Sequence, residues 1–111
     1  MVKAEKAGYI VVFITAADEE EAALISRVLL KQRKAACVNI IAGVSSLFWW
    51  QDKIESAPES LLLVKTRAAL LDEIVKLVKE IHSNDVPEII ALPIVGGSRD
   101  YLEWIDNEAA D

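Results

Sequence analysis

The sequence predicts a single α+β domain in which two strand–helix–strand halves are joined by a long hairpin and followed by a short terminal helix. Three observations predict it: a β-branched apolar run near the start, two apolar stripes at helical spacing, and a long pair of apolar arms around a turn. The length of 111 residues suits one domain over 1–111 with one core. Residues 1–8 are expected to form a flexible tail.

The first strand is predicted over residues 9–15, where a short β-branched and aromatic run is typical of a central strand buried on both faces. The first helix follows, because Asp18 and Glu21 have the spacing of a capping box and apolar residues then recur at helical spacing up to about Lys34. Acidic residues at its start and basic residues at its end both favour the helix dipole.

A long hairpin is predicted over residues 36–66, because both arms are rich in Val, Ile and aromatic residues and residues 51–52 can turn. An unbroken first arm would be roughly 50 Å long, whereas a compact domain of this length is about 35 Å across. The hairpin is therefore expected to bend, to overhang, or both. Gly43 is the natural bulge position, and Pro58 indicates an edge or a bulge in the returning arm.

The second helix is predicted after Thr66, which can cap its start. Its one-sided apolar stripe consists of Leu70, Leu71, Ile74, Leu77, Val78 and Ile81. The last strand is expected over residues 88–95, and a Gly96-Gly97 turn then leads to Ser98, which can cap a short terminal helix. The order strand, helix, strand, strand, helix, strand is that of the ferredoxin-like fold, with both helices on one face of an antiparallel sheet.

The tip of the hairpin carries a large apolar patch made of Leu47, Phe48, Trp49, Trp50 and Ile54. On a monomer such a patch would be exposed, and exposed patches of this size usually mark association surfaces. The sequence therefore predicts a homo-oligomer built by hairpin pairing.

Composition excludes several classes of function. The formal net charge of −6, without a local basic patch, argues against nucleic-acid binding. One cysteine and one histidine exclude a disulfide framework and every zinc signature that needs two or more Cys and His from one chain. The apolar run at 9–14 is too short for a signal segment or a membrane span, so we expect a soluble, cytoplasmic protein. Without a nucleophile elbow or a phosphate-binding glycine loop, we expect no enzyme.

Several segments, in order and spread over nearly the whole chain from Tyr9 onward, resemble the CutA family of divalent cation tolerance proteins. They are Ala-Ala-Cys-Val-Asn-Ile-Ile at 35–41, Phe-Trp-Trp at 48–50 with Lys-Ile-Glu at 53–55, Leu-Val-Lys-Thr at 63–66, Val-Pro-Glu-Ile-Ile-Ala-Leu-Pro at 86–93 and Tyr-Leu-Glu-Trp at 101–104. The resemblance implies a ferredoxin-like subunit in a homotrimer, with hairpins extending the sheet between neighbours and a cleft at each subunit boundary. It also implies tolerance of copper and other divalent cations, a trimer similar to that of nitrogen-regulatory signalling proteins, and no settled enzymatic activity.

The chain departs from the family pattern at three places. After His82 the family usually has Pro-Tyr-Glu or Pro-Tyr-Asp, whereas this chain has Ser-Asn-Asp at 83–85. An aromatic residue expected near the cleft is therefore missing. Ala42 replaces the proline that commonly precedes Gly43, and Asp52 replaces a glycine common at the hairpin tip. These two differences are expected to change loop geometry only.

Four residues are candidate metal ligands. Cys37 matches the family cysteine and a thiolate suits copper, although a free cysteine in an apolar strand is more often a small buried hydrophobe. His82 ends the second helix, where an imidazole can bind metal or face the helix C-terminus as a partial cation. With Asp85 and Glu88 it could form a nitrogen and oxygen set for a divalent ion, to which three-fold symmetry would add copies.

The resemblance places Lys65, Arg67 and Glu88 beside the intersubunit cleft, with Trp50 as an aromatic wall. Such convergent polar groups are typical of a ligand pocket. The alternative is an ion pair between Lys65 and Glu88 of neighbouring subunits. Phe48, Trp49, Trp50 and Ile54 are expected to form the trimer interface, because Trp is enriched in interface cores.

The sequence therefore predicts a cytoplasmic, non-enzymatic homotrimer involved in the response to divalent metal ions. Copper or another divalent ion is the expected ligand, and no organic cofactor, nucleic acid or membrane is expected. One alternative is a signalling module that holds a small molecule in the intersubunit cleft. The other is a structural trimer that organises an unknown protein partner.

Overall fold

The computed structural model describes residues 8–110, so all of the predicted tail except Gly8 lies outside the described residues. The elements in chain order are β1 (Tyr9–Ala16), α2 (Glu19–Lys31), β2 (Cys37–Trp50), β3 (Lys53–Arg67), a 3₁₀ turn (Ala68–Leu70), α3 (Leu71–Ile81), β4 (Ile89–Pro93) and α4 (Arg99–Glu108). No helix among residues 8–110 has the length and apolar character needed to cross a membrane.

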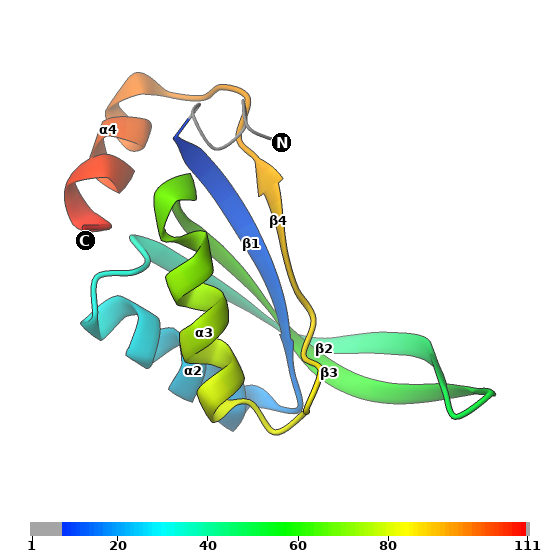
Figure 1. The fold of residues 1–111 in the computed structure, drawn as a ribbon. Helices are drawn as coiled ribbons and strands as arrows, with labels where there is room; N and C mark the ends of the chain where they lie inside the picture. The colour runs from blue at the N-terminus through cyan, green and yellow to red at the C-terminus, as the bar shows by residue number, and fades with distance from the viewer. Residues whose placement is uncertain (1–7, 111) are drawn as a thin grey trace.

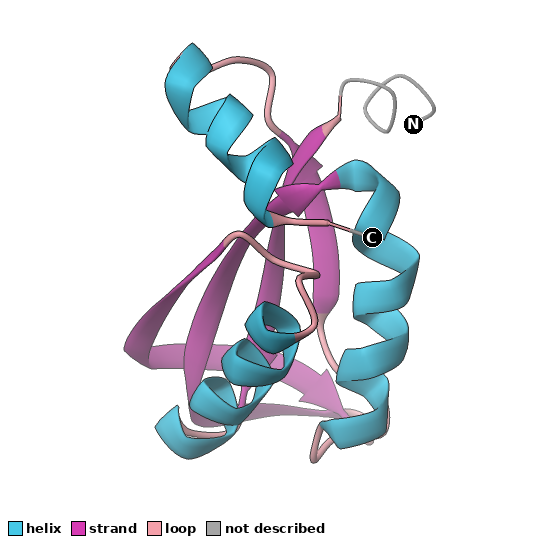
Figure 2. Cartoon of the chain, turned by 90° about the vertical axis from the view of Figure 1, so that its left-hand side faces the viewer, coloured by secondary structure: helices cyan, strands magenta, loops and turns pink. Residues whose placement is uncertain are grey.

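The sheet has the order β2-β3-β1-β4, and each neighbouring pair is antiparallel. The helices α2 and α3 lie side by side on one face of this sheet (Figures 1 and 2). This confirms the predicted ferredoxin-like fold and the central position of β1.

The core lies between this face of the sheet and the two helices. Alternate side chains of β1 and β3 point into it, and the fully buried ones include Val12, Ile14, Leu62 and Val64. The predicted stripe on the second helix is confirmed, because Leu70, Ile74 and Val78 are fully buried and Leu71, Leu77 and Ile81 pack against the core. The opposite face of the sheet is only half-buried in one chain, so the prediction that β1 is buried on both faces is wrong for a single subunit.

The start of α2 confirms the capping prediction with one change. The Asp18 carboxylate accepts a hydrogen bond of 2.8 Å from the Glu21 N–H. In return, the Glu21 carboxylate accepts a hydrogen bond of 2.8 Å from the N–H of Ala17, one residue before the cap. The helix ends at Lys31, earlier than predicted, because the chain turns through Arg33, whose φ is +61°.

The prediction that Thr66 caps the second helix is wrong. Thr66 lies within β3 opposite Ile10, and its fully buried hydroxyl donates a 2.6 Å hydrogen bond to the carbonyl of Lys34. The chain instead enters α3 through the 3₁₀ turn, and Leu70 at the cap position makes no side-chain capping bond. The last strand is also shorter than predicted, because its ladder with β1 runs only from Ile89 to Pro93.

The long hairpin overhangs the domain, as expected. β3 pairs with β1 only from Ser60 to Arg67, so its first seven residues extend past the central strand together with the tip of β2. Figure 1 shows this hairpin leaving the body on the side away from α4. The register shifts between Ile41 and Val44, and Gly43 has a φ of +75°, which confirms the predicted bulge. Pro58 lies in the overhang, where β3 is paired only with β2.

The hairpin turn offers a first test of the structure. Gln51 and Asp52 both have positive φ, 49° and 64°, a conformation that favours glycine or asparagine in tight turns. We expect Asp52→Gly to raise the free energy of unfolding by about 0.5–1 kcal/mol, measured by chemical denaturation. Asp52→Ala removes the same carboxylate without relieving the backbone, so it should give no gain. Equal gains from both variants would contradict this explanation.

Candidate functional site

The predicted metal residue Cys37 lies on the face of the sheet that α2 and α3 leave uncovered. Cys37 pairs with Lys65 across the β2–β3 ladder, whereas their neighbours Val38 and Val64 face the core. The Lys65 ammonium donates a hydrogen bond to the side-chain oxygen of Asn39. The Cys37 Sγ lies 4.0 Å from the same oxygen. A thiol, an amide and an ammonium group are therefore gathered on this face, and Cys37 is half-buried in one chain.

Helix α4 adds a fourth group to this cluster. The Tyr101 side chain lies near the Cys37 thiol, and its ring lies 5.4 Å from that of Trp104. Burial, and then the Cys37 thiol, raises the pKa of Tyr101 above its ordinary value of 10.0. Tyr101 therefore stays protonated at neutral pH and can donate to sulfur. The sequence did not indicate this contact, because the two residues come from distant elements.

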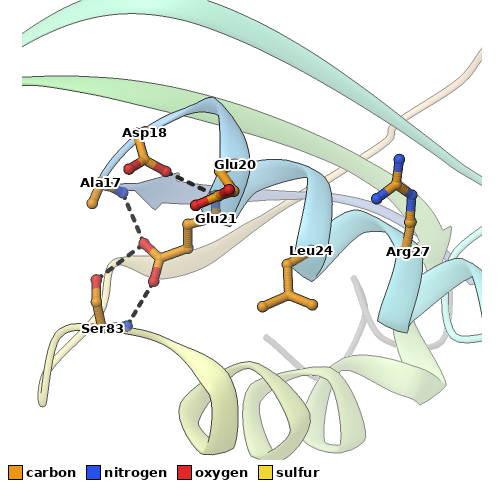
Figure 3. A pocket seen from close by; sticks show the side chains of 7 residues that line it. All are labelled: Ala17, Asp18, Glu20, Glu21, Leu24, Arg27 and Ser83. Carbon is orange, nitrogen blue, oxygen red and sulfur yellow. Dashed lines mark hydrogen bonds between the residues drawn. The ribbon is translucent and has the colours of Figure 1, made fainter.

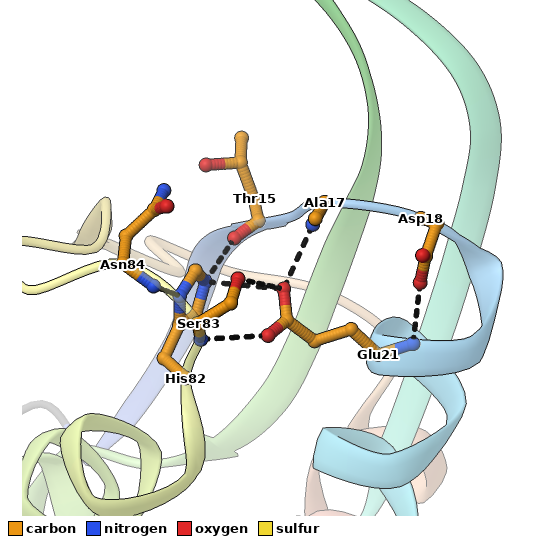
Figure 4. Close-up of polar contacts among 7 residues, drawn as sticks. All are labelled: Thr15, Ala17, Asp18, Glu21, His82, Ser83 and Asn84. Atoms are coloured by element: carbon orange, nitrogen blue, oxygen red, sulfur yellow. Dashed lines mark hydrogen bonds and ion pairs between the residues drawn. The ribbon is translucent and has the colours of Figure 1, made fainter.

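The structure places His82 at the end of α3, with a fully buried side chain. Its Nδ1 accepts a hydrogen bond of 3.0 Å from the N–H of Asn84, and its Nε2 lies 2.7 Å from the carbonyl oxygen of Thr15 (Figure 4). Because Nδ1 accepts, Nε2 carries the proton and donates to Thr15. Both nitrogens are therefore engaged within the chain, and a metal could reach Nδ1 only if the Asn84 N–H moved away.

Glu21 joins the start of α2 to the segment after α3, a role that the capping pattern alone did not reveal. Its carboxylate accepts hydrogen bonds from the Ser83 N–H at 2.7 Å and the Ser83 hydroxyl at 3.1 Å. It also lies 3.9 Å from His82 Nε2, and only 12% of its side chain is exposed. Ser83, one of the departures from the family pattern, supplies two of the donors. A proline at this position would lack the N–H.

Burial by itself raises the pKa of the Glu21 carboxyl. The hydrogen bonds from Ala17 and Ser83, together with nearby His82, outweigh burial and hold its pKa below the ordinary value of 4.5. A carboxyl whose pKa is lowered by folding stabilises the protein above its unfolded-state pKa, and this stability is lost as the pH falls through the folded-state value.

We therefore expect Glu21→Gln to lower the free energy of unfolding at pH 7 by about 1.5–3 kcal/mol, because it weakens several charge-assisted hydrogen bonds. The difference from the unsubstituted protein should shrink below pH 4.5, where the native Glu21 also becomes protonated. Urea titrations of both proteins at pH 7 and at acidic pH measure this difference in the free energy of unfolding. A difference that stays constant over this pH range would contradict the assignment.

A surface hollow of about 450 Å³ adjoins Glu21. Figure 3 shows the carboxylates of Asp18 and Glu20 toward one end of it and Arg27 at the other, with Leu24 between them. None of the residues predicted from the sequence to bind metal or ligand lines it. Its walls are mainly apolar and it is widely open, so it offers no enclosed binding site.

Within one chain the predicted metal ligands are not gathered. Among residues 8–110 there is no group of three or more His, Cys, Asp and Glu side chains that could hold a metal ion. Through the sheet register, Cys37 of β2 is aligned with Val11 of β1, because both pair with Lys65. His82 binds Thr15, which lies four residues, or roughly 13 Å, further along β1. A site that combines Cys37 with His82, Asp85 and Glu88 would need more than one subunit, and it stays a prediction.

The predicted ligand cleft is also spread out in one chain. Lys65 and Arg67 share one face of β3, and Glu88 precedes β4 at the other end of the β1 ladder. Trp50 lies opposite Lys53 at the hairpin tip, roughly 40 Å along the strand from Lys65. Trp50 and Lys65 can therefore line the same cleft only if they come from different subunits.

Comparison with known proteins agrees with the fold and with the resemblance. Residues 10–108 match the family model described as CutA1 divalent ion tolerance protein. The chain is 43% identical to Protein CutA 1, chloroplastic, of Oryza sativa over 92% of this chain and 58% of that protein. It is 45% identical to the divalent-cation tolerance protein CutA of Thermus thermophilus over 86% of this chain and 92% of that one. The chain thus spans little more than half the length of the chloroplastic relative.

Solved structures show the same fold. The crystal structure of CutA1 from Oryza sativa superposes with a TM-score of 0.92 at 42% identity, covering 94% of this chain and 95% of that one. The structure from Thermus thermophilus gives a TM-score of 0.90 at 42% identity, covering 92% and 99%. Sequence and structure therefore agree over nearly the whole described chain, which belongs to the CutA1 divalent ion tolerance family.

Proposed function

We propose that this chain acts in the cytoplasm as a non-enzymatic homotrimer in the tolerance of divalent cations and binds copper weakly through Cys37. The observation that carries the proposal is the position of the Cys37 thiol. The thiol lies on the uncovered face of the sheet beside Asn39 and Tyr101. The chain also belongs to the divalent ion tolerance family, so a thiol at this place is a candidate metal ligand.

The homotrimer is supported by the apolar surface that one chain leaves exposed. At the hairpin tip Leu47, Trp49 and Ile54 are each more than 60% exposed, and Trp49 and Ile54 face each other across the two strands. Phe48 and Trp50 are also exposed on the opposite side of the hairpin. Apolar surface of this extent favours association with further copies. Phe48, Trp49, Trp50 and Ile54 are the residues that we assign to the interface.

The proposed metal chemistry follows from the donors that one chain supplies. A thiolate is a soft ligand suited to copper, whereas the amide oxygen of Asn39 and the hydroxyl of Tyr101 are harder, neutral donors. One thiolate with neutral oxygens makes a weak site, so affinity depends on copies of Cys37 from other subunits. His82, Asp85 and Glu88 would supply a second, harder donor set for a divalent ion only together with copies from other subunits, and Nδ1 would have to give up its bond to the Asn84 N–H.

Copper binding should depend on Cys37. Competition with a chromophoric copper(I) chelator measures the affinity of the native protein, Cys37→Ser and His82→Gln. We expect Cys37→Ser to weaken binding by at least about tenfold, which corresponds to 1.4 kcal/mol, because the soft donor is lost. His82→Gln should have the smaller effect, because both ring nitrogens are already engaged. Equal affinity of the native protein and Cys37→Ser would overturn the assignment of Cys37.

The alternative function, a small-molecule module, is favoured by one observation. Lys65 and Arg67 place two cationic side chains on the same uncovered face of β3 in a chain that is acidic overall. In a trimer, Trp50 and Glu88 of a neighbouring subunit could complete this cleft. A thermal-shift screen of small anions would test it, because a ligand at 100 times its Kd stabilises by about 2.7 kcal/mol. The shift should be lost in Lys65→Ala.

A further inference from the structure

We propose that the contact between Glu21 and Ser83 is a latch that keeps the Nδ1 nitrogen of His82 capped by the chain, and that release of this latch turns His82 into an open nitrogen ligand. The latch regulates the second donor set of the proposed function. It rests on that function only in taking a divalent cation as the occupant of the open nitrogen.

The imidazole of His82 is held by backbone groups on both of its nitrogens. Its side chain is fully buried, although the next two residues, Ser83 and Asn84, are exposed. The Asn84 N–H donates to Nδ1 at 3.0 Å, and Nε2 donates to the Thr15 carbonyl at 2.7 Å. Thr15 belongs to the central strand β1, whereas Asn84 lies in a segment without regular structure. A local opening would therefore free Nδ1 and leave Nε2 in place.

Glu21 holds this segment against the start of α2. Its carboxylate accepts hydrogen bonds from the Ser83 N–H at 2.7 Å, the Ser83 hydroxyl at 3.1 Å and the Ala17 N–H at 2.8 Å. Figure 4 shows the carboxylate between Ala17 and Ser83, beside the His82 ring. Within residues 8–110, the hydrogen bonds of Ser83 and Asn84 run to Glu21 and to His82. Loss of the Glu21 bonds would therefore leave the cap on Nδ1 held by one hydrogen bond.

The closed state already gives His82 the tautomer that a ligand needs. The Thr15 carbonyl fixes the proton on Nε2, so Nδ1 keeps its lone pair. Carbonyl groups commonly orient metal-binding imidazoles in this way. The segment that opens also carries Asp85, whose carboxylate is a hard oxygen donor. Opening thus frees a nitrogen donor three residues from a carboxylate, a pair that suits a divalent cation.

The latch can open without unfolding of the subunit. Residues 83–86 are all exposed, and Val86 is 88% exposed. Segments with few buried contacts open locally at a lower cost in free energy than the whole domain. The charge-assisted bonds to Glu21 are then the main contribution that keeps this segment closed. The pKa of the Glu21 carboxyl lies below its ordinary value of 4.5, so the acceptor is ionised at neutral pH.

The test is the rate at which diethyl pyrocarbonate modifies His82, the only histidine in the chain, followed by the absorbance of the N-carbethoxy product. We expect Glu21→Gln to raise the rate at neutral pH about tenfold, because a neutral amide replaces the ionised acceptor. Ser83→Ala should raise it about threefold, since the hydroxyl bond is lost and the N–H bond remains. When opening is fast, the rate follows the population of the open state.

Two controls separate the latch from a general loss of stability. Glu19→Gln removes the same charge from the first turn of α2, where Glu19 is exposed and has no hydrogen bond or ion pair with another described residue. Leu70→Ala weakens the core at the opposite end of α3, roughly 18 Å along the helix from His82. Both variants should stay within about twofold of the native rate. Circular dichroism and sedimentation check that every variant keeps its fold and assembly.

Rates unchanged in both Glu21→Gln and Ser83→Ala would overturn the latch. A rate that rises in Leu70→Ala in proportion to its loss of unfolding free energy would also overturn it, because His82 would then be exposed only by global unfolding. Repeating the Glu21→Gln measurement with zinc chloride tests the cation separately, since an ion on Nδ1 should protect the ring. Absence of that protection would show that His82 is not the ligand assigned to it in the proposed function, while faster modification would still establish the latch.

Discussion

Replacing Trp49 by aspartate should convert the homotrimer into monomers. Trp49 is 71% exposed in one chain and lies opposite Ile54, which is 64% exposed, at the tip of the overhanging hairpin. If this surface is buried between subunits, a carboxylate placed there loses the apolar contact and must be desolvated. Buried tryptophans at interfaces typically contribute about 2 kcal/mol or more each, and the loss would recur at every interface of the trimer.

Sedimentation equilibrium measures the result directly, because the mass should fall from three times 12.2 kDa to 12.2 kDa. Lys76→Asp, which places the same carboxylate on the exposed side of α3, is the control and should leave the trimer intact. Far-UV circular dichroism should show that both variants remain folded. A Trp49→Asp variant that still sediments as a trimer would contradict the assignment of the hairpin tip to the interface.

The largest loss of subunit stability is expected from Leu62→Ala. Leu62 is fully buried on β3 between Ile14 of β1 and Ile40 of β2, and its side chain faces α2 and α3. Truncation removes apolar contacts and leaves a cavity that the surrounding strands can fill only in part. Changes of this kind cost about 2–5 kcal/mol.

Leu24→Ala is the matched control, because Leu24 is 49% exposed on α2 and the same atoms are removed. We expect it to cost less than about 1 kcal/mol. Denaturant titrations must be compared at equal protein concentration, since the stability of an oligomer depends on concentration. Similar costs at the two positions would contradict the placement of the core.

Local sequence patterns predicted most of the fold because the responsible interactions are local. The capping residues Asp18 and Ser98, the bulge at Gly43 and the stripe from Leu70 to Ile81 each depend on neighbours a few positions away. Thr66 was misassigned for the opposite reason. Its hydroxyl is used by the carbonyl of Lys34, more than thirty residues away, and no local pattern shows that contact.

The same distinction applies to the candidate site. The resemblance drew attention to Cys37 and His82, but the partners that decide their chemistry lie in distant parts of the chain. Tyr101 of α4 lies near Cys37, and the carbonyl of Thr15 at the end of β1 accepts a hydrogen bond from His82. The contact between Glu21 and Ser83 spans 62 positions. Such contacts form only when the elements pack together, so the sequence identified the residues but not the groups that they contact.

Native mass spectrometry of the protein titrated with copper, with Cys37→Ser beside it, measures assembly and metal binding together. We expect the native protein to have a mass of three times 12.2 kDa with a defined number of bound copper ions. Cys37→Ser should give the same trimer without those ions. A monomeric native mass, or equal copper binding by the two proteins, would contradict a trimer that binds copper through Cys37.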